Sequence, residues 1–193
     1  TASRFGQELG KLFSSIKPNI TVSRSIGDVT LCIPRIFDKP ISVLTTSGDI
    51  EARDIHVTDL NFTSTSGEIS VELFAPLNRG AFTNTSGDIN IEADANDVQI
   101  STVSGDVEIH GDYDHLKFAS TSGDVIWNGE CDQVELSTTS GDLTLDGLTV
   151  RQHARITSTS GDVRWEGQCP ETEISSISGD LTVEGPFPAL SLN

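Results

Sequence analysis

The chain has few basic residues, no methionine and no long apolar run, and each shortage excludes a class of protein. Lys and Arg number 12 against 29 Asp and Glu, a formal net charge of −17, so the basic patch that nucleic acid or an anionic membrane surface requires is missing. No stretch approaches the roughly 20 apolar residues of a membrane-spanning helix. Methionine is absent even at position 1, which indicates a processed or trimmed piece of a longer chain.

The three cysteines indicate neither a zinc site nor a disulfide framework. Cys32, Cys131 and Cys169 are odd in number and lack Cys-x-x-Cys spacing. Cys131 and Cys169 both stand eight residues after a repeated glycine, with one further repeat between them. We therefore expect buried, free thiols that lie too far apart for a disulfide.

What the chain has in abundance is one repeated turn. The tripeptide Ser-Gly-Asp recurs, with a Ser-Gly-Glu copy and a degenerate Ser-Ile-Gly-Asp copy, at intervals of 18 to 21 residues. The glycines of these copies are Gly27, Gly48, Gly67, Gly87, Gly105, Gly123, Gly141, Gly161 and Gly179. Propeller blades need about twice this period, and a β-sandwich would not keep one tripeptide in phase, so the repeat favours a solenoid.

Apolar residues hold fixed positions around each glycine. Large apolar side chains stand five residues before it, as at Phe118, and two and four residues after it, as at Val125 and Trp127. The position three residues after the glycine is mostly polar. This period of two predicts a half-buried strand on each side of the turn. A second turn, which often carries glycine, as at Gly129, completes each repeat.

Stacking would give these repeats the core that one unit of 18 residues cannot close alone. The sequence predicts an all-β, single-chain β-solenoid (β-helix) of about nine coils of 18 to 20 residues, roughly 43 Å long. We expect one domain over 1–193, with a short N-terminal capping helix over 1–17, repeat coils over 20–184 and a C-terminal cap over 185–193. Pro186 and Pro188 are expected to stop strand pairing after the last coil.

The residues of the repeated turn have a structural explanation and one functional alternative. Glycine supplies a positive φ, and Asp and Ser can bond to the backbone of their own turn. Stacking would place the acidic residues in a column, where neighbours repel by about 1 kcal/mol even in water. Hydrogen bonds would offset this repulsion, and so would weakly bound divalent cations. The candidate cation ligands are Asp106, Asp124, Asp142, Asp162 and Asp180.

The sequence gives little support for catalysis. His56, His110, His115 and His153 are assigned to different phases or loops, and they pair with no nucleophile in a recognisable motif. Each repeated glycine opens a strand rather than a helix, so no phosphate-binding loop is predicted. We expect no enzyme activity, no catalytic residues and no cofactor beyond a weakly bound cation.

The repeat also resembles a known family. The segment Ile-Thr-Ser-Thr-Ser-Gly-Asp-Val at 156–163 resembles the repeats of a bacterial adhesin domain of unknown function, a β-solenoid of cell-envelope and envelope-stress proteins. Over 20–184, this resemblance implies a non-enzymatic adhesin or scaffold module that binds a protein or glycan partner through its regular faces. It also implies a location in the cell envelope or outside the cell. Three cysteines are unusual for an exported protein, so the cytoplasm is the alternative location.

A structural protein that polymerises end to end, as bactofilin-like solenoids do, is the alternative function. The predicted capping helix and the two late prolines favour a monomer over a polymer. Light scattering at increasing concentration discriminates the two, because a filament grows while a capped module keeps a constant mass.

Overall fold

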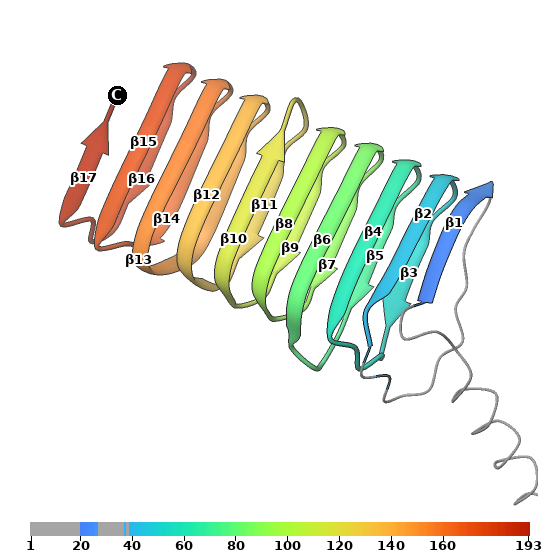
Figure 1. The fold of residues 1–193 in the computed structure, drawn as a ribbon. Helices are drawn as coiled ribbons and strands as arrows, with labels where there is room; N and C mark the ends of the chain where they lie inside the picture. Colours follow the sequence, from blue (N-terminus) through green and yellow to red (C-terminus); the bar gives the residue numbers. More distant parts are fainter. Residues whose placement is uncertain (1–19, 27–36, 38) are drawn as a thin grey trace, which may run out of the picture.

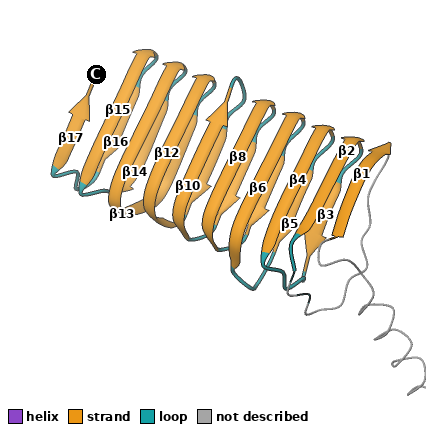
Figure 2. Cartoon of the chain, in the orientation of Figure 1, coloured by secondary structure: helices purple, strands orange, loops and turns teal. Residues whose placement is uncertain are grey.

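The structure is a parallel β-solenoid in which two ribbons of strands enclose one core (Figure 1). It is a computed structural model that describes residues 20–26, 37 and 39–193. In this part of the chain every regular element is a strand, with no helix (Figure 2). The predicted all-β solenoid of about nine coils is therefore confirmed. Within the same residues, no helix is long and apolar enough to cross a membrane.

The two ribbons differ in strand length and in their place in each repeat. The strands that precede the repeated turns form the long ribbon, which consists of β1 (Ile20–Ile26), β2 (Ile41–Ser47), β4 (Asp59–Ser66), β6 (Leu77–Ser86), β8 (Ala95–Ser104), β10 (Tyr113–Ser120), β12 (Glu130–Ser140), β15 (Glu171–Ser178) and β17 (Ala189–Leu192). The short ribbon consists of β3 (Ile50–Arg53), β5 (Ile69–Glu72), β7 (Ile89–Glu92), β9 (Val107–His110), β11 (Val125–Asn128), β14 (Val163–Gln168) and β16 (Leu181–Glu184). β13 (Leu143–Ser160) belongs to both, because it pairs with β11 and β14 near its start and with β12 and β15 near its end.

Parallel pairing keeps equivalent residues aligned from coil to coil. On the long ribbon, Phe62 pairs with Phe82, Phe82 with Ile100, and Ile100 with Phe118. Each position of the repeat therefore forms a column along the solenoid axis, with neighbouring members about 4.8 Å apart. Columns that face inward build the core, and columns that face outward build the surfaces.

The core consists of the apolar columns that the sequence predicts. Five residues before the glycine, the buried side chains are Val43, Phe62, Phe82, Ile100, Phe118, Leu136, Ile156 and Ile174. Two and four residues after it, burial is equally regular from Ile50 to Trp165. Tyr113 packs against Trp127 with ring centroids 5.9 Å apart. Each buried large side chain contributes about 1.5–3 kcal/mol, so every coil adds a similar increment of stability.

The described cysteines are packing residues, as the sequence predicts. Cys131 and Cys169 are buried and free. Val150, the register partner of Cys131, belongs to the coil between them. Burial raises the pKa of the Cys131 thiol to about 12, because the thiolate would lose its hydration. Cys32 lies outside the described residues.

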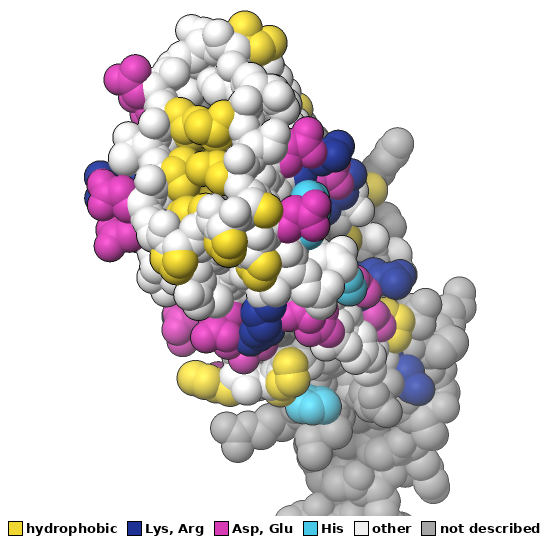
Figure 3. All heavy atoms as spheres, turned by 90° about the vertical axis from the view of Figure 1, so that its left-hand side faces the viewer, with side chains coloured by type: hydrophobic (Ala, Val, Ile, Leu, Met, Phe, Trp, Pro, Cys, Tyr) yellow, Lys and Arg dark blue, Asp and Glu magenta, His cyan; other side chains and the backbone are white. Residues whose placement is uncertain are grey.

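The predictions for the two ends have different outcomes. The capping helix over 1–17 lies outside the described residues. The prediction that Pro186 and Pro188 stop strand pairing is wrong, because β17 follows both prolines and pairs with β15. Neither proline lies within a strand, so neither interrupts the ladder. The C-terminal end is seen directly in Figure 3, where apolar side chains lie between the ribbons. Leu192 in this last coil is 55% exposed.

Candidate functional site

The aspartate of the repeated turn links each coil to the next. Asp106 Oδ1 accepts the backbone N–H of Asp124 at 2.9 Å, and Asp124 Oδ1 accepts that of Asp142 at 2.8 Å. The same bond joins Asp49 to Glu68, Asp88 to Asp106, Asp142 to Asp162 and Asp162 to Asp180. The sequence predicts this bond within each turn, but the structure places it between coils. We call this column of carboxylates the aspartate ladder.

Serine and glycine of the turn also contact the preceding coil. Ser122 Oγ donates to the carbonyl oxygen of Val103 at 3.2 Å, and Ser66 and Ser104 make the equivalent bond. Gly123 has a φ of 114°, and a Cβ there would lie 2.2 Å from the carbonyl oxygen of Gly105. Glycine is thus required both by its φ and by the close approach of the neighbouring backbone.

The five candidate cation ligands lie in one column, as predicted. Asp106, Asp124, Asp142 and Asp162 each use one carboxylate oxygen in the ladder, and Asp180 donates its N–H to Asp162. These bonds supply the offset that the repulsion within the column requires. Over the residues that the structure describes, no three or more His, Cys, Asp or Glu side chains gather as a metal site. Weak cation binding by this column stays a prediction.

A buried polar column, which the sequence analysis overlooks, lies three residues before each glycine. Ser120 Oγ donates to the carbonyl oxygen of Ser122 at 3.1 Å, and Thr138 makes the same bond to Ser140 at 3.3 Å. Asn84 instead donates its Nδ2 to the carbonyl oxygens of Gly67 and Gly87. The available signal was a Ser, Thr or Asn at one inward position of every repeat from Thr45 onward. Most of these side chains therefore bond to the turn backbone from inside the core, whereas the hydroxyl of Ser158, in the same column, has no hydrogen-bond partner among the described residues.

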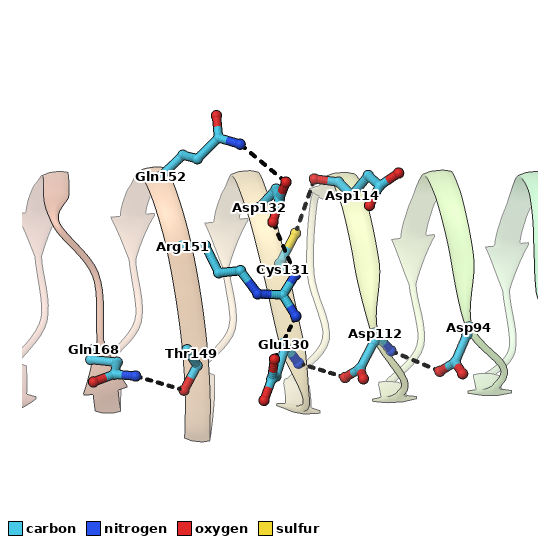
Figure 4. A network of polar contacts seen from close by, with 10 residues as sticks. All are labelled: Asp94, Asp112, Asp114, Glu130, Cys131, Asp132, Thr149, Arg151, Gln152 and Gln168. Carbon is cyan, nitrogen blue, oxygen red and sulfur yellow. Dashed lines mark hydrogen bonds and ion pairs between the residues drawn. The ribbon is translucent and has the colours of Figure 1, made fainter.

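The second turn carries a shorter ladder, shown in Figure 4. Asp94 Oδ1 accepts the N–H of Asp112 at 3.0 Å, and Asp112 Oδ1 accepts that of Glu130 at 2.9 Å. In the next coil, Thr149 takes the register position of Glu130, and no acidic side chain continues the ladder.

Arg151 lies where the second-turn ladder stops. Its guanidinium donates to Asp132 at 2.9 Å and to Glu130 at 2.5 Å (Figure 4). Hydrogen bonds to these two carboxylates raise the pKa of Arg151. Arg151 thus offsets the negative charge of the second turn at this point, which makes a structural role the direct explanation of this residue.

A groove of about 510 Å³ crosses five coils of the long ribbon, from β6 to β13. Its outer wall is the column eight residues before each glycine, and its inner wall is the column six residues before. These walls consist of Arg79, Asp97, His115, Gln133 and His153 on the outer side and of Ala81, Gln99, Lys117, Glu135 and Arg155 on the inner side. The column between them, including Val98, Leu116 and Val134, is buried and forms the floor. We call this feature the long-ribbon groove.

Most charged groups of the groove are paired between coils. Lys117 Nζ lies 2.7 Å from Glu135 Oε2, and His115 Nδ1 lies 3.2 Å from Asp97 Oδ1. Arg155 Nη2 contacts Glu173 at 2.8 Å, just beyond the groove. Arg79 differs, since its guanidinium makes no ion pair or side-chain hydrogen bond with any described residue.

The prediction that the histidines occupy different phases or loops is wrong for two of them. His115 and His153 share one phase, eight residues before Gly123 and Gly161, and both are register neighbours of Gln133. Counting forward from the preceding glycine hides this, because the coil before His153 is two residues longer than the coil before His115. The two residues therefore line one wall of the groove. His110 lies apart on the short ribbon, bonded to Glu108 at 2.9 Å.

The groove also differs from the rest of the molecule in charge. Three Lys or Arg and two His line it against two acidic residues, whereas acidic residues outnumber Lys and Arg 29 to 12 over the chain. A positive balance in a strongly acidic molecule marks a local surface with its own electrostatic preference. The long-ribbon groove is therefore both concave and richer in basic residues than the rest of the chain.

Comparison with known proteins identifies the family. The family model described as Toastrack DUF4097 matches residues 14–128 and 126–186, which together span most of the chain. Nothing matches in the comparisons with curated proteins and with solved structures. The adhesin resemblance drawn from the repeat is supported only in its coarser form, as a β-solenoid domain of unknown function. With its repeated turn and its two-ribbon solenoid, the chain belongs to the Toastrack DUF4097 family.

Proposed function

We propose that this Toastrack domain is a non-enzymatic interaction scaffold that presents the long-ribbon groove to an extended partner. One observation carries the proposal: residues at equivalent positions of the groove change from coil to coil, whereas those of the repeated turn stay the same. The outer wall runs Arg79, Asp97, His115, Gln133, His153. In repeat proteins, constant positions hold the stack together and variable positions on an extended concave face contact partners.

The contacts of the groove support a binding role over a catalytic one. His115 and His153 are the groove's candidate bases, and their ion-pair partners are Asp97 and Glu171. A base that activates a hydroxyl or thiol nucleophile of the protein lies within hydrogen-bond reach of a Ser, Thr or Cys side chain. No such contact is made by either histidine within the described part of the chain.

We further propose the bacterial cell envelope as the location, on the resemblance of the repeats to envelope domains. An elongated, acidic rod with one specialised face suits a scaffold that lies among envelope polymers. Cell fractionation of the full-length protein tests this part. Recovery in the envelope fraction supports it, and recovery in the cytoplasm contradicts it.

A pair of charge-matched variants tests the groove itself. Lys117→Glu with Arg155→Glu reverses two charges in the groove, and Arg53→Glu with Arg164→Glu reverses two on the short ribbon. The four side chains are equally exposed, at 55–59%. Both variants and the unmodified chain are assayed against an oligosaccharide array and a library of linear peptides. The groove variant is expected to lose about tenfold in affinity for the ligands that bind, and the control to keep it. Equal binding by both variants would overturn the proposal, as would a lack of any ligand.

A further inference from the structure

The shape, polarity and charge of the long-ribbon groove point to one class of partner. We propose that the groove binds a linear glycan carrying sugar carboxylates, laid along the solenoid axis with one carboxylate on Arg79. This inference rests on the proposed function and adds the chemistry of the partner to it.

The dimensions of the groove fit a single extended chain. The two walls are two residues apart on each strand, about 7 Å, and the five coils span roughly 19 Å along the axis. An α-helix is about 10–12 Å across with its side chains and is too wide to lie between these walls. The groove also crosses the strands rather than following them. A ligand in it therefore meets a new pair of side chains at every coil instead of adding a strand to a sheet edge.

The walls offer planar polar groups and no apolar anchor. Planar carboxylate and amide groups line the walls at Asp97, Gln99, Gln133 and Glu135. Those of Asp97, Gln133 and Glu135 are each partly engaged by a neighbouring side chain. Such groups bond in pairs to the adjacent hydroxyls of a sugar ring. Protein partners usually supply a large aromatic or apolar side chain to a pocket. The floor is closed to that contact, since residues such as Leu116 are already buried in the core. This contrast favours a glycan over a peptide.

Arg79 supplies the charge preference. It lies at the β6 end of the groove, where Gly80 is part of the floor and Ala81 leaves the inner wall low, and its guanidinium is unpaired among the described residues. A guanidinium matches a carboxylate with two parallel, charge-assisted hydrogen bonds. The other Lys and Arg side chains of the lining, Lys117 and Arg155, are already ion-paired. The groove therefore suits a chain with spaced carboxylates, rather than the densely charged backbone of a nucleic acid.

Calorimetric titration with three probes of four residues each tests the inference. These are tetragalacturonate, the neutral cellotetraose and the acidic peptide tetraglutamate. Tetragalacturonate is expected to bind about tenfold more tightly than either of the others, and Arg79→Ala is expected to remove that advantage. Arg164→Ala on the short ribbon is the matched control and should change nothing. Thermal unfolding of both variants is expected to match the unmodified chain, because neither removes a buried contact.

The outcomes separate this inference from the proposed function. Equal binding of tetragalacturonate and cellotetraose, or an unchanged affinity in Arg79→Ala, would overturn the carboxylate contact. Binding of tetraglutamate alone, lost in the groove double variant, would overturn the glycan and leave the groove as a binding surface. Glycan binding that survives the groove double variant would overturn both.

Discussion

The Ser-Gly-Asp turn and the long-ribbon groove lie a few residues apart on the same strands, yet they follow opposite rules. At the turn, nearly every coil repeats the same residues, because most coils make the same contact with their neighbour; Glu68 is the exception among the described coils. Asp124, for example, bonds to Asp142 as Asp106 bonds to Asp124. In the groove, equivalent residues differ in size and in the sign of their charge. Positions that keep the same residue from coil to coil are thus those that hold neighbouring coils together. Positions whose residue changes from coil to coil are those whose side chains can contact a partner.

The two regions also solve the same electrostatic problem in different ways. Stacking brings equivalent side chains to about one strand spacing, where like charges repel. The turn keeps one sign of charge and offsets it with backbone N–H donors. The groove alternates opposite charges in register, as between Lys117 and Glu135. The first solution depends on an aspartate in the coil that accepts the bond, and the ladder is interrupted at Glu68, whereas the second leaves room for an unpaired residue such as Arg79.

The largest effect is expected from adding one methyl group at the turn. Gly123→Ala places a Cβ against the Gly105 carbonyl at a φ that alanine rarely adopts, so we expect a loss of about 3 kcal/mol in the free energy of unfolding. Gly147→Ala is the control, since Gly147 has a φ of 71° and its closest contact would be the Asn128 side chain at 3.3 Å. It should lose only about 1 kcal/mol. Equal losses in urea unfolding would show that close approach between coils is not the constraint.

The second prediction concerns the core, and it is the dependence of the unfolding free energy on pH that comes from the buried Cys131 thiol. Burial raises the pKa of Cys131 in the folded protein to about 12, from 9.0 for an ordinary cysteine thiol. As the pH rises, the thiol therefore loses its proton in the unfolded chain before it does so in the folded protein. The contribution of Cys131 to the free energy of unfolding is complete below pH 9 and falls as the pH rises toward 12. The slope approaches about 1.4 kcal/mol per pH unit. Cys131→Val keeps the packing and should lack this part of the slope. Identical pH profiles above pH 9 would contradict the assignment.

The stability that the aspartate ladder contributes should depend on the carboxylate oxygen as a hydrogen-bond acceptor and not on its negative charge. Asp124→Ala leaves the Asp142 N–H without its acceptor and should cost about 1 kcal/mol. Asp124→Asn keeps a carbonyl oxygen in place and removes one charge from the column, so its stability should match or exceed that of the unmodified chain. Urea midpoints compare the two. An Asn variant as unstable as the Ala variant would mean that the charge itself stabilises the turn.

Groove charges should contribute little to stability. Lys117 and Glu135 are exposed, and an exposed ion pair contributes about 0.2–1 kcal/mol. Lys117→Ala should therefore change the unfolding free energy by less than the ladder variant Asp124→Ala does. A larger loss would make the groove a structural element and remove the contrast with the turn.

The smallest effect is expected from calcium. Most ladder carboxylates already accept an N–H, and Ca²⁺ needs six to eight oxygen ligands. Titration with CaCl₂ should give at most a weak, non-saturating heat, with no defined stoichiometry. A saturable site lost in Asp124→Asn would show that cations, and not hydrogen bonds, offset the column.

The sequence predicts the solenoid and its core well, because the residues that are buried stand at the same positions of every repeat. Residues such as Phe118 and Trp127 alternate with polar neighbours, and parallel stacking turns that alternation directly into a core. It predicts the chemistry of the turn only in part. The Asp124 carboxylate accepts a hydrogen bond from the neighbouring coil. The hydropathy pattern does not tell whether a carboxylate accepts an N–H of its own turn or of the next coil.

The groove was harder to foresee. Its walls combine residues from five coils, and the longer coil before His153 shifts that residue when positions are counted from the preceding glycine. The inward Ser120 was missed for a different reason. A hydroxyl that bonds to the backbone two residues away is compatible with burial, although its polarity suggests the surface. The prediction from the two prolines is wrong because Pro186 and Pro188 lie at a corner outside the strands, where Pro186 still accepts the Cys169 N–H and no N–H of either proline is needed.

The central claim is that the constant turn holds the coils and the variable groove binds the partner. The most direct test measures urea stability and tetragalacturonate affinity on the same two variants, Asp124→Ala and Lys117→Glu with Arg155→Glu. We predict that the first loses stability and keeps its affinity, and that the second loses affinity with little change in stability. A loss of stability and affinity together in either variant would contradict the account.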